Sequence, residues 1–444
     1  MWISGDGGTL MKEASSTEYR VPSIDTVAVS NGHSTSIEAE GAFHEITGGV
    51  TAPKGFQAAG VYCGIRKVKK DIALITSDVP ANAASVFTLN TVIAAPLVVD
   101  KELLARGEKK CSAIVVNSGN ANACTGERGM MDAWTMVRET ANILGIPEEE
   151  SLVSSTGVIG QYMPMENVVN GIRILPSQLS ATGSSDAAEA IMTTDTYAKE
   201  IAVEFEIQGK GKIRIGGIAK GSGMIQPNMA TMLAFLTTDA NIAQPLLQKT
   251  FGKLIGRSFN RISVDGDTST NDMAILLANG QSGTLELTEG TKAFELFKEA
   301  LEFVLVRLAK MIARDGEGAT KLVEIIVKGA RTEAEALQAA RSVANSNLVK
   351  TAIHGADANW GRILAAVGYS GIDFDPANVS LYFGELPILK PNYEIVIDEI
   401  KAKDIFSQEN ITITVDLNQG SENANFWTCD LSKDYVHINA SYRS

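Results

Sequence analysis

A glycine-rich segment, a lysine and a threonine are the residues of this sequence that could bind an anion or carry a nucleophile. They lie together in residues 216–236, which read GGIAKGSGMIQPNMATMLAFL. Lys220 stands in the glycine-rich part, which reads as a loop, eleven positions before Thr231. The apolar residues that follow Thr231 predict a strand over 232–236.

Two simple interpretations of this segment fall short. A phosphate-binding loop is excluded because the glycine spacing fits neither G-x-G-x-x-G nor G-x4-G-K-S/T, and because a strand rather than a helix follows. A glycine turn before a core strand explains the apolar run. It leaves the positions of Lys220 and Thr231 unexplained.

The sequence favours no metal site. Asp265, Asp267 and Asp272 imitate a calcium-binding loop, but the glycine among them is at the wrong position, and we expect a strand-to-helix turn with an N-cap there. The histidines and cysteines are scattered, and no Cys-x-x-Cys pair occurs. Their positions are His33, His44, His354, His437, Cys63, Cys111, Cys124 and Cys429.

The elements that must position these residues alternate between strands and helices. Residues 71–76, 113–117, 379–383, 393–397, 411–415 and 435–438 predict strands, and 201–207 with 212–216 predict a hairpin. Helices are expected over 132–144, 246–259 and 294–312, and Thr332 to Glu335 form a capping box that opens another. The mixture lacks strict βαβ repetition and therefore predicts a mixed α/β fold.

The composition and net charge of the chain restrict the classes of partner that it could bind. The 444 residues carry a net charge of −13, which speaks against extended contact with nucleic acid or an anionic membrane. No apolar run reaches the roughly 18 residues of a membrane span. Residues 1–40 are polar and lack the apolar core of a signal peptide, so we expect a disordered N-terminal extension and a cytoplasmic protein.

A series of short blocks, in order along the chain from about residue 46 to 444, resembles the ornithine acetyltransferase family. That family comprises the bifunctional glutamate N-acetyltransferases of arginine biosynthesis. The blocks are AKGSGMI (219–225) with PNMATML (227–233), GGVTAPKGF (48–56), NSGNANAC (117–124), STGVIG (155–160), SVDGDTSTND (263–272), DGEGAT (315–320), NWGR (359–362), CDLS (429–432) and INASYRS (438–444).

The resemblance implies that the chain cleaves itself between Ala230 and Thr231. An alpha chain, 41–230, and a beta chain, 231–444, would result. A threonine hydroxyl is a poor nucleophile until a base removes its proton, and the freed α-amino group of Thr231, with a reference pKa of about 7.7–8.0, would be that base. Cleavage would therefore create the catalyst.

The resemblance also assigns supporting residues. Thr156 and Gly157 match the family's oxyanion hole. The matching substrate contacts are Thr194, Lys220, Thr231, Glu317, Asn439 and Ser444. Thr193 and Thr196 compete with Thr194 for its role. Lys220 could hold a carboxylate as a point charge, and Glu317 the amino group of ornithine.

The implied activity is transfer of acetyl from N2-acetyl-L-ornithine to L-glutamate through an acetyl-Thr231 intermediate, with acetyl-CoA as a further possible donor and no bound cofactor. The implied fold is an αββα layered core shared by both chains, with a second, smaller α/β region. The implied assembly is a heterotetramer of two alpha and two beta chains. Two alternatives stay open: an N-terminal-nucleophile amidohydrolase or aminopeptidase, and an uncleaved protein that binds a small ligand.

The sequence departs from the family pattern at a few positions. Gln226 precedes Pro227 where a histidine is usual, and His44 precedes the first block. Ser444 stands where the family commonly has a threonine, and it keeps the hydroxyl. The N-terminal extension is long.

Overall fold

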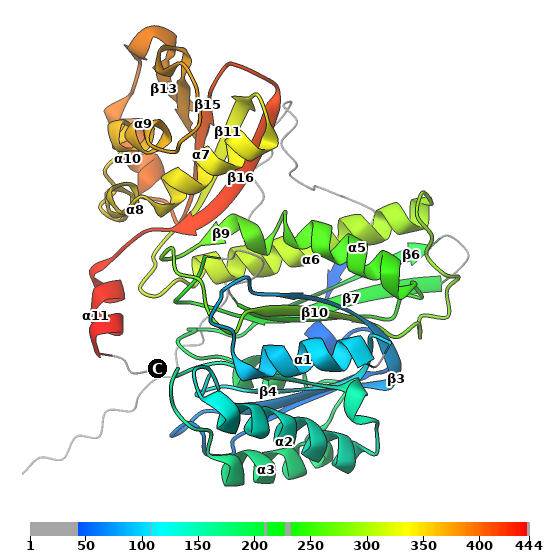
Figure 1. Cartoon of the computed structure of the whole chain (residues 1–444). Helices are drawn as coiled ribbons and strands as arrows, with labels where there is room; N and C mark the ends of the chain where they lie inside the picture. Colours follow the sequence, from blue (N-terminus) through cyan, green and yellow to red (C-terminus); the bar gives the residue numbers. More distant parts are fainter. Residues whose placement is uncertain (1–42, 107, 208–210, 227–231, 442–444) are drawn as a thin grey trace, which may run out of the picture. The chain divides into compact units, whose positions relative to one another are not determined.

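The computed structural model describes residues 43–106, 108–207, 211–226 and 232–441 (Figure 1). Its strands form two mixed sheets, one of nine strands and one of seven, and helices pack on both. The mixed α/β fold predicted from the sequence is confirmed. The expected disordered extension over 1–40, the expected cleavage point at Ala230 and Thr231, and Ser444 all lie outside the described residues.

The larger sheet brings distant parts of the sequence together. Its order is β1 (His44–Ile46), β6 (Lys199–Ile207), β7 (Gly211–Lys220), β8 (Leu233–Thr238), β10 (Met273–Ala278), β3 (Ile72–Phe87), β4 (Lys110–Asn117) and β5 (Ser151–Ser155), with β2 (Phe56–Val61) paired to β3. Lys220 of β7 pairs with Leu233 of β8, and Leu233 pairs with Met273 of β10. These three residues therefore lie at the same end of three neighbouring strands.

Strand β8 is buried on both faces, as its continuous apolar sequence predicts. Leu233 and Phe235 belong to one core cluster, and Ala234 and Leu236 belong to another. The two sets alternate because successive side chains of a strand point to opposite faces. Strand β8 thus separates two cores.

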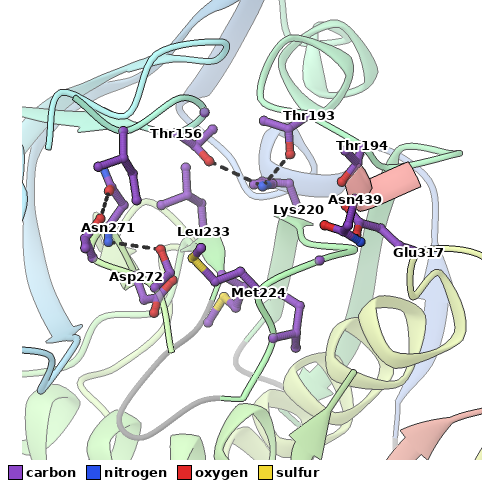
Figure 2. A pocket seen from close by; sticks show the side chains of 17 residues that line it. Thr156, Thr193, Thr194, Lys220, Met224, Leu233, Asn271, Asp272, Glu317 and Asn439 are labelled. Atoms are coloured by element: carbon purple, nitrogen blue, oxygen red, sulfur yellow. Dashed lines mark hydrogen bonds between the residues drawn. The ribbon is translucent and has the colours of Figure 1, made fainter. Parts of the chain in front are cut away.

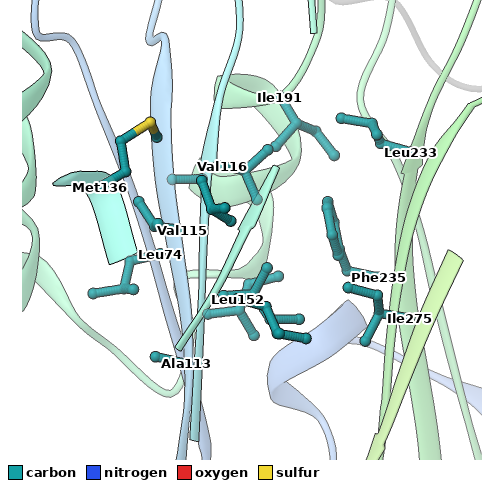
Figure 3. Close-up of a cluster of buried hydrophobic side chains, with 14 of the residues drawn as sticks. Leu74, Ala113, Val115, Val116, Met136, Leu152, Ile191, Leu233, Phe235 and Ile275 are labelled. Atoms are coloured by element: carbon teal, nitrogen blue, oxygen red, sulfur yellow. The ribbon is translucent and has the colours of Figure 1, made fainter. Parts of the chain in front are cut away.

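The first of these cores lies between two layers of strands. In Figure 3, Leu233 and Phe235 of β8 lie on one side, and Val116 of β4 and Leu152 of β5 lie on the other. Helices α2 (Gly126–Leu144) and α3 (Met165–Ile174) lie beyond β4, and α5 (Gln244–Ile255) and α6 (Lys292–Arg314) lie beyond β7 and β10 (Figure 1). This helix–strand–strand–helix order is the predicted αββα arrangement.

The second sheet forms the predicted smaller α/β region. Its order is β14 (Glu394–Ile395), β13 (Leu386–Lys390), β12 (Ser380–Phe383), β15 (Asn410–Asp416), β11 (Leu322–Ala330), β16 (Glu422–Cys429) and β9 (Ile262–Ser263). Helices α7 (Glu333–Asn345), α8 (Asn347–His354), α9 (Trp360–Gly368) and α10 (Glu399–Phe406) accompany it. The hydroxyl of Thr332 accepts a hydrogen bond from the backbone N–H of Glu335, which confirms the helix start predicted there.

Three further helices complete the described part of the chain: α1 (Ala95–Arg106), α4 (Ser184–Ala190) and α11 (Lys433–Ser441). Among the helices that the structure describes, none is both long enough and apolar enough to cross a membrane.

Several predicted elements differ from the structure. Residues 435–438 alternate like a strand, yet they lie in α11, where no side chain is buried and Asn439 Nδ2 donates to the carbonyl oxygen of Tyr435 one turn earlier. Lys220 ends strand β7 instead of lying in a loop. The helix expected over 246–259 ends at Ile255, and the strand expected over 393–397 covers only two residues.

Gly216 in β7 lies in close contact with the backbone of Gly49. A Cβ at this position would lie 1.7 Å from the carbonyl oxygen of Gly49, which is backbone and cannot move aside cheaply. We expect Gly216→Ala to lower the free energy of unfolding by about 1–3 kcal/mol, the usual range for overpacking.

The matched control is Gly252→Ala in helix α5, where an added Cβ meets nothing within 4 Å. Because alanine is the better helix former, this variant should gain about 0.5–1 kcal/mol. Thermal melting of both proteins checks the difference. Equal melting temperatures would contradict the close packing of Gly216.

Candidate active site

A cavity of about 140 Å³ opens at the end of β7, β8 and β10 where Lys220, Leu233 and Met273 lie side by side (Figure 2). Polar side chains and glycines form much of its wall. The lining residues are Thr156, Gly157, Ile159, Thr193, Thr194, Lys220, Gly223, Met224, Ile225, Met232, Leu233, Ser269, Thr270, Asn271, Asp272, Glu317 and Asn439.

The cavity brings together the site residues expected from the sequence that the structure describes. These are Thr156, Gly157, Thr194, Lys220, Glu317 and Asn439. They come from five separate stretches of the chain, so only the fold could collect them. Of the three competing threonines, Thr193 and Thr194 line the cavity, whereas the N–H and hydroxyl of Thr196 donate to Asp315.

Thr156 and Gly157 form a tight turn just after β5. Gly157 has φ of 134°, and a Cβ there would lie 2.3 Å from the backbone carbon of Gly119, so this position requires glycine. Asn271 Nδ2 donates to the carbonyl oxygen of Ser155 at 2.9 Å and thereby braces the turn. Within the described residues, no group accepts from the N–H of Gly157, which leaves it available to a ligand.

Lys220 is 8% exposed and has its ammonium inside the cavity. Its Nζ donates to Thr193 Oγ1 at 2.8 Å and to Thr156 Oγ1 at 3.3 Å (Figure 2). Burial lowers the pKa of Lys220 from its ordinary value, and the negative charge of Asp195 opposes that shift.

Glu317 and Asn439 form the wall of the cavity across from Thr156 and Asn271 (Figure 2). Asn439 Nδ2 donates to Glu317 Oε2 at 2.7 Å and holds the carboxylate in place. Gly223 allows this approach, because a Cβ there would lie 2.4 Å from the carboxylate carbon of Glu317. The glycine-rich segment therefore makes room for an acidic side chain.

A buried ion cluster ties the walls together. Lys199 Nζ bonds Asp195 Oδ1 at 2.7 Å and Asp315 Oδ2 at 2.5 Å, and all three side chains are at most 3% exposed. Asp195 also accepts from the backbone N–H of Thr193 and of Gly221. Burial opposes its ionisation, but Lys199 and Lys220 hold the pKa of Asp195 below its ordinary value.

Asp272 is a buried cavity residue with an unsatisfied polar atom. It directly precedes β10, is 3% exposed, and its Oδ2 has no hydrogen-bond partner among the described residues. Burial raises the pKa of Asp272 well above its ordinary value, and a hydrogen bond with Ser269 and the charge of Lys220 offset only part of this.

Asp265 of the same segment has a structural role. Asp265 accepts hydrogen bonds from the backbone N–H groups of Met224 and Ile225, and so fixes the segment that follows β7. In the part of the chain that the structure describes, no three His, Cys, Asp or Glu side chains are grouped as metal ligands. The strand-to-helix turn expected over 265–272 is wrong, because strand β10 follows.

Sequence reasoning missed three parts of the site. The sequence presents Asp272 as a false calcium ligand and as the last residue of the block over 263–272, whereas a carboxylate at the head of an apolar strand is a further signal of a site. Asn271 and the cluster of Asp195, Lys199 and Asp315 had no local signal, because their partners lie far away in the sequence.

Asp272 provides a test through pH. The unfolded chain ionises this carboxyl at a pKa of about 3.9, whereas the folded chain keeps it protonated to a higher pH. Above about pH 4 folding must therefore take up a proton, and the free energy of unfolding falls as the pH rises toward the folded pKa. We expect the free energy of unfolding of Asp272→Asn to exceed that of the wild type by about 1–3 kcal/mol near neutral pH. This gain should shrink toward pH 4.

Asp195→Asn is the matched control and should change in the opposite direction. Its folded pKa is depressed, so its contribution to stability is present at neutral pH and is lost on acidification. Melting curves from about pH 2 to pH 8 measure both variants, because the loss for Asp195 begins only below the unfolded pKa of about 3.9. A lower melting temperature of Asp272→Asn near pH 7 would mean that this carboxyl is ionised and stabilised in the folded chain.

Comparison with known proteins identifies the family. The sequence model of the ArgJ family matches residues 57–444. The arginine biosynthesis bifunctional protein ArgJ of Caldanaerobacter subterraneus subsp. tengcongensis is 52% identical over 403 residues, which cover 90% of this chain and 99% of the relative. Its counterpart in Symbiobacterium thermophilum is 52% identical over 402 residues, with 90% and 99% covered.

Solved structures include a chain of ornithine acetyltransferase complexed with ornithine, from Mycobacterium tuberculosis. It is 36% identical, with a TM-score of 0.39, and the match covers 42% of this chain and all of that chain. The match to the family model spans most of the chain, and so do the matches to the two bacterial relatives. The chain belongs to the ArgJ family.

Proposed function

We propose that this protein transfers acetyl from N2-acetyl-L-ornithine to L-glutamate in arginine biosynthesis, with Thr231 as the nucleophile. One observation carries the proposal. The cavity at the end of β7 and β8 combines a hydroxyl and a free backbone N–H with an ammonium and a carboxylate, and Thr231 directly precedes its lining residue Met232. The names of the bacterial relatives support the same pathway.

The chain cleaves itself before it can react. The Thr231 hydroxyl attacks the carbonyl carbon of Ala230, the hydroxyl proton passes to the peptide nitrogen as the C–N bond breaks, and water hydrolyses the resulting ester to a free carboxylate and the free hydroxyl. The α-amino group freed in this way takes the hydroxyl proton in the next attack. It acts as the base because a threonine side chain has none of its own. In the described sheet β7 and β8 are neighbours, so the two chains would stay associated through this strand pairing.

Acetyl transfer then runs in two halves. The Thr231 hydroxyl attacks the acetyl carbonyl of the donor, the negative oxygen accepts hydrogen bonds from Thr156 and Gly157, and ornithine leaves with the proton on its nitrogen. Glutamate attacks the acetyl ester in the reverse sense. Each donor aimed at such an oxyanion contributes roughly 3 kcal/mol to the transition state.

The two ends of the substrate meet different walls. The carboxylate of Glu317, held by Asn439, is suited to the side-chain ammonium of ornithine, and Thr194 and Ser444 are proposed as further contacts. The family resemblance assigns Lys220 to a substrate carboxylate, whereas in this structure its ammonium donates to the hydroxyls of Thr193 and Thr156.

The same proposal covers the remaining properties. Side chains and backbone alone supply the nucleophile, base and oxyanion donors, so the reaction needs no bound metal or organic cofactor, and acetyl-CoA is a second donor. The protein works in the cytoplasm as two alpha and two beta chains. A hydrolase built on the same chemistry would release free acetate, and product analysis with glutamate present separates the two.

Cleavage is tested directly on the purified protein. We expect two chains on a denaturing gel, with the smaller one reading Thr-Met-Leu-Ala from its N-terminus. Thr231→Ala should leave one intact 47.2 kDa chain without transferase activity, because it lacks the attacking hydroxyl. A different N-terminal residue would remove Thr231 from the mechanism, and an intact wild-type chain would favour the ligand-binding alternative.

The role of Glu317 is tested by varying each substrate separately. Glu317→Gln keeps the shape and the bond to Asn439 through an amide oxygen, but removes the charge. We expect KM for N-acetylornithine to rise strongly, since unpairing a desolvated charge typically costs about 2–5 kcal/mol, and KM for glutamate to change little.

Asp434→Asn is the matched control, because it removes a carboxylate from exposed helix α11 outside the cavity. It should leave both constants unchanged. Equal losses for donor and acceptor in Glu317→Gln would refute the assignment of Glu317 to the ornithine ammonium.

A further inference from the structure

We propose that Lys220 is a positioning residue of the oxyanion hole, because its ammonium makes the hydroxyls of Thr156 and Thr193 accept hydrogen bonds and thereby turns their hydrogens into the cavity. The inference rests on the proposed acetyl transfer and adds to it. It gives Lys220 a role that does not require contact with the substrate.

Hydrogen-bond chemistry fixes the direction of these contacts. A lysine ammonium carries three donors and no acceptor, whereas a hydroxyl can do both. In the contacts of Nζ with Thr193 Oγ1 at 2.8 Å and with Thr156 Oγ1 at 3.3 Å, the hydroxyls must therefore accept. Each keeps one hydrogen to donate elsewhere.

Nothing else in the described part of the chain takes up those hydrogens. No further hydrogen-bond partner of either hydroxyl occurs among the described residues, and both line the cavity. In Figure 2, Lys220 lies between Thr156 and Thr193. The hydroxyl of Thr156 is thus prepared as a donor before any substrate arrives, which is what makes an oxyanion hole effective.

The charge of Lys220 acts through the same contact. A hydroxyl that accepts from a cation becomes a stronger donor, because successive hydrogen bonds polarise each other in a low dielectric. The 3.3 Å contact with Thr156 is long, and such contacts commonly tighten when charge develops in the transition state. Lys220 should therefore assist the reaction more than it assists binding.

The surroundings of Lys220 keep its ammonium in place. Burial and the nearby charge of Lys199 disfavour the charged form of Lys220. Asp195 and Glu317 face it with negative charge and favour that form, and Asp272 does so only when it is ionised. Asp195 also accepts from the N–H of Gly221 at 2.7 Å, which fixes the backbone next to Lys220. The side chain is therefore held from its own strand and from the cavity wall.

A double-mutant cycle separates this role from binding of a substrate carboxylate. The variants are Thr156→Ala, Lys220→Met and both together, with Lys220→Arg as the conservative replacement that also only donates. Lys212→Met is the matched control, an exposed lysine on the same strand. Gels give the cleaved fraction of each variant, and kcat is divided by it.

If Lys220 acts through Thr156, both single variants lose about 10²-fold in kcat with KM nearly unchanged, and the double variant loses little more. Lys220→Arg should recover part of the loss, and Lys212→Met should equal the wild type. Losses that multiply in the double variant, or a raised KM for both substrates with kcat preserved, would overturn the inference. A wild type that transfers no acetyl would instead refute the proposed function.

A second measurement uses the wild-type enzyme and therefore does not depend on how a substitution affects folding or cleavage. Acetylation of the enzyme by N-acetylornithine is followed in a single turnover as the pH rises. Once the ammonium loses its proton, its nitrogen can accept a hydrogen bond from a hydroxyl. The acetylation rate should therefore begin to fall at a pH below the ordinary lysine pKa of about 10.4, while the affinity for N-acetylornithine is unchanged. A constant rate with weakening affinity would show that Lys220 binds the substrate.

Discussion

The buried contact of Lys199 with Asp195 and Asp315 is the interaction on which the site depends. Two carboxylates with one ammonium would be unstable in an apolar core, unless their remaining lone pairs were used. They are used by the N–H of Thr193, of Thr196 and of Gly221. One lysine thus sets the relative positions of three chain segments that line the cavity.

The same cluster explains how the cavity tolerates so many charges. Lys199 with its two carboxylates leaves one negative charge in excess, and Lys220 lies close enough to offset it. Glu317 follows Asp315 by two residues, and Ser222 donates to the carbonyl oxygen of Asp315, so the acidic wall is held by the same network. Asp272 lies outside the network, which is why its carboxyl resists ionisation.

The sequence predicted much of this structure and missed what depends on long-range contacts. The helix expected over 294–312 follows from periodicity, because burial of one face selects the residues, and the structure has it over Lys292–Arg314. The strand expected over 232–236 follows from a continuous apolar run, and the structure has it over Leu233–Thr238. Residues 435–438 alternate like a strand but form a helix, since none of the described strands pairs with them. Asp195 and Lys199 could not be identified as a pair with Asp315, because 116 positions separate Lys199 from its second partner.

The antiparallel pairing of β7 with β8 has a consequence for the lifetime of the protein. A break between these strands would leave six residue pairs of the sheet intact, from Ile215 with Thr238 to Lys220 with Leu233. The folded structure would change little on cleavage. Denaturation, however, would release two separate chains, which must associate again in order to refold. The mature protein would be metastable: its persistence would depend on how slowly it opens, and recovery after denaturation would become a second-order process.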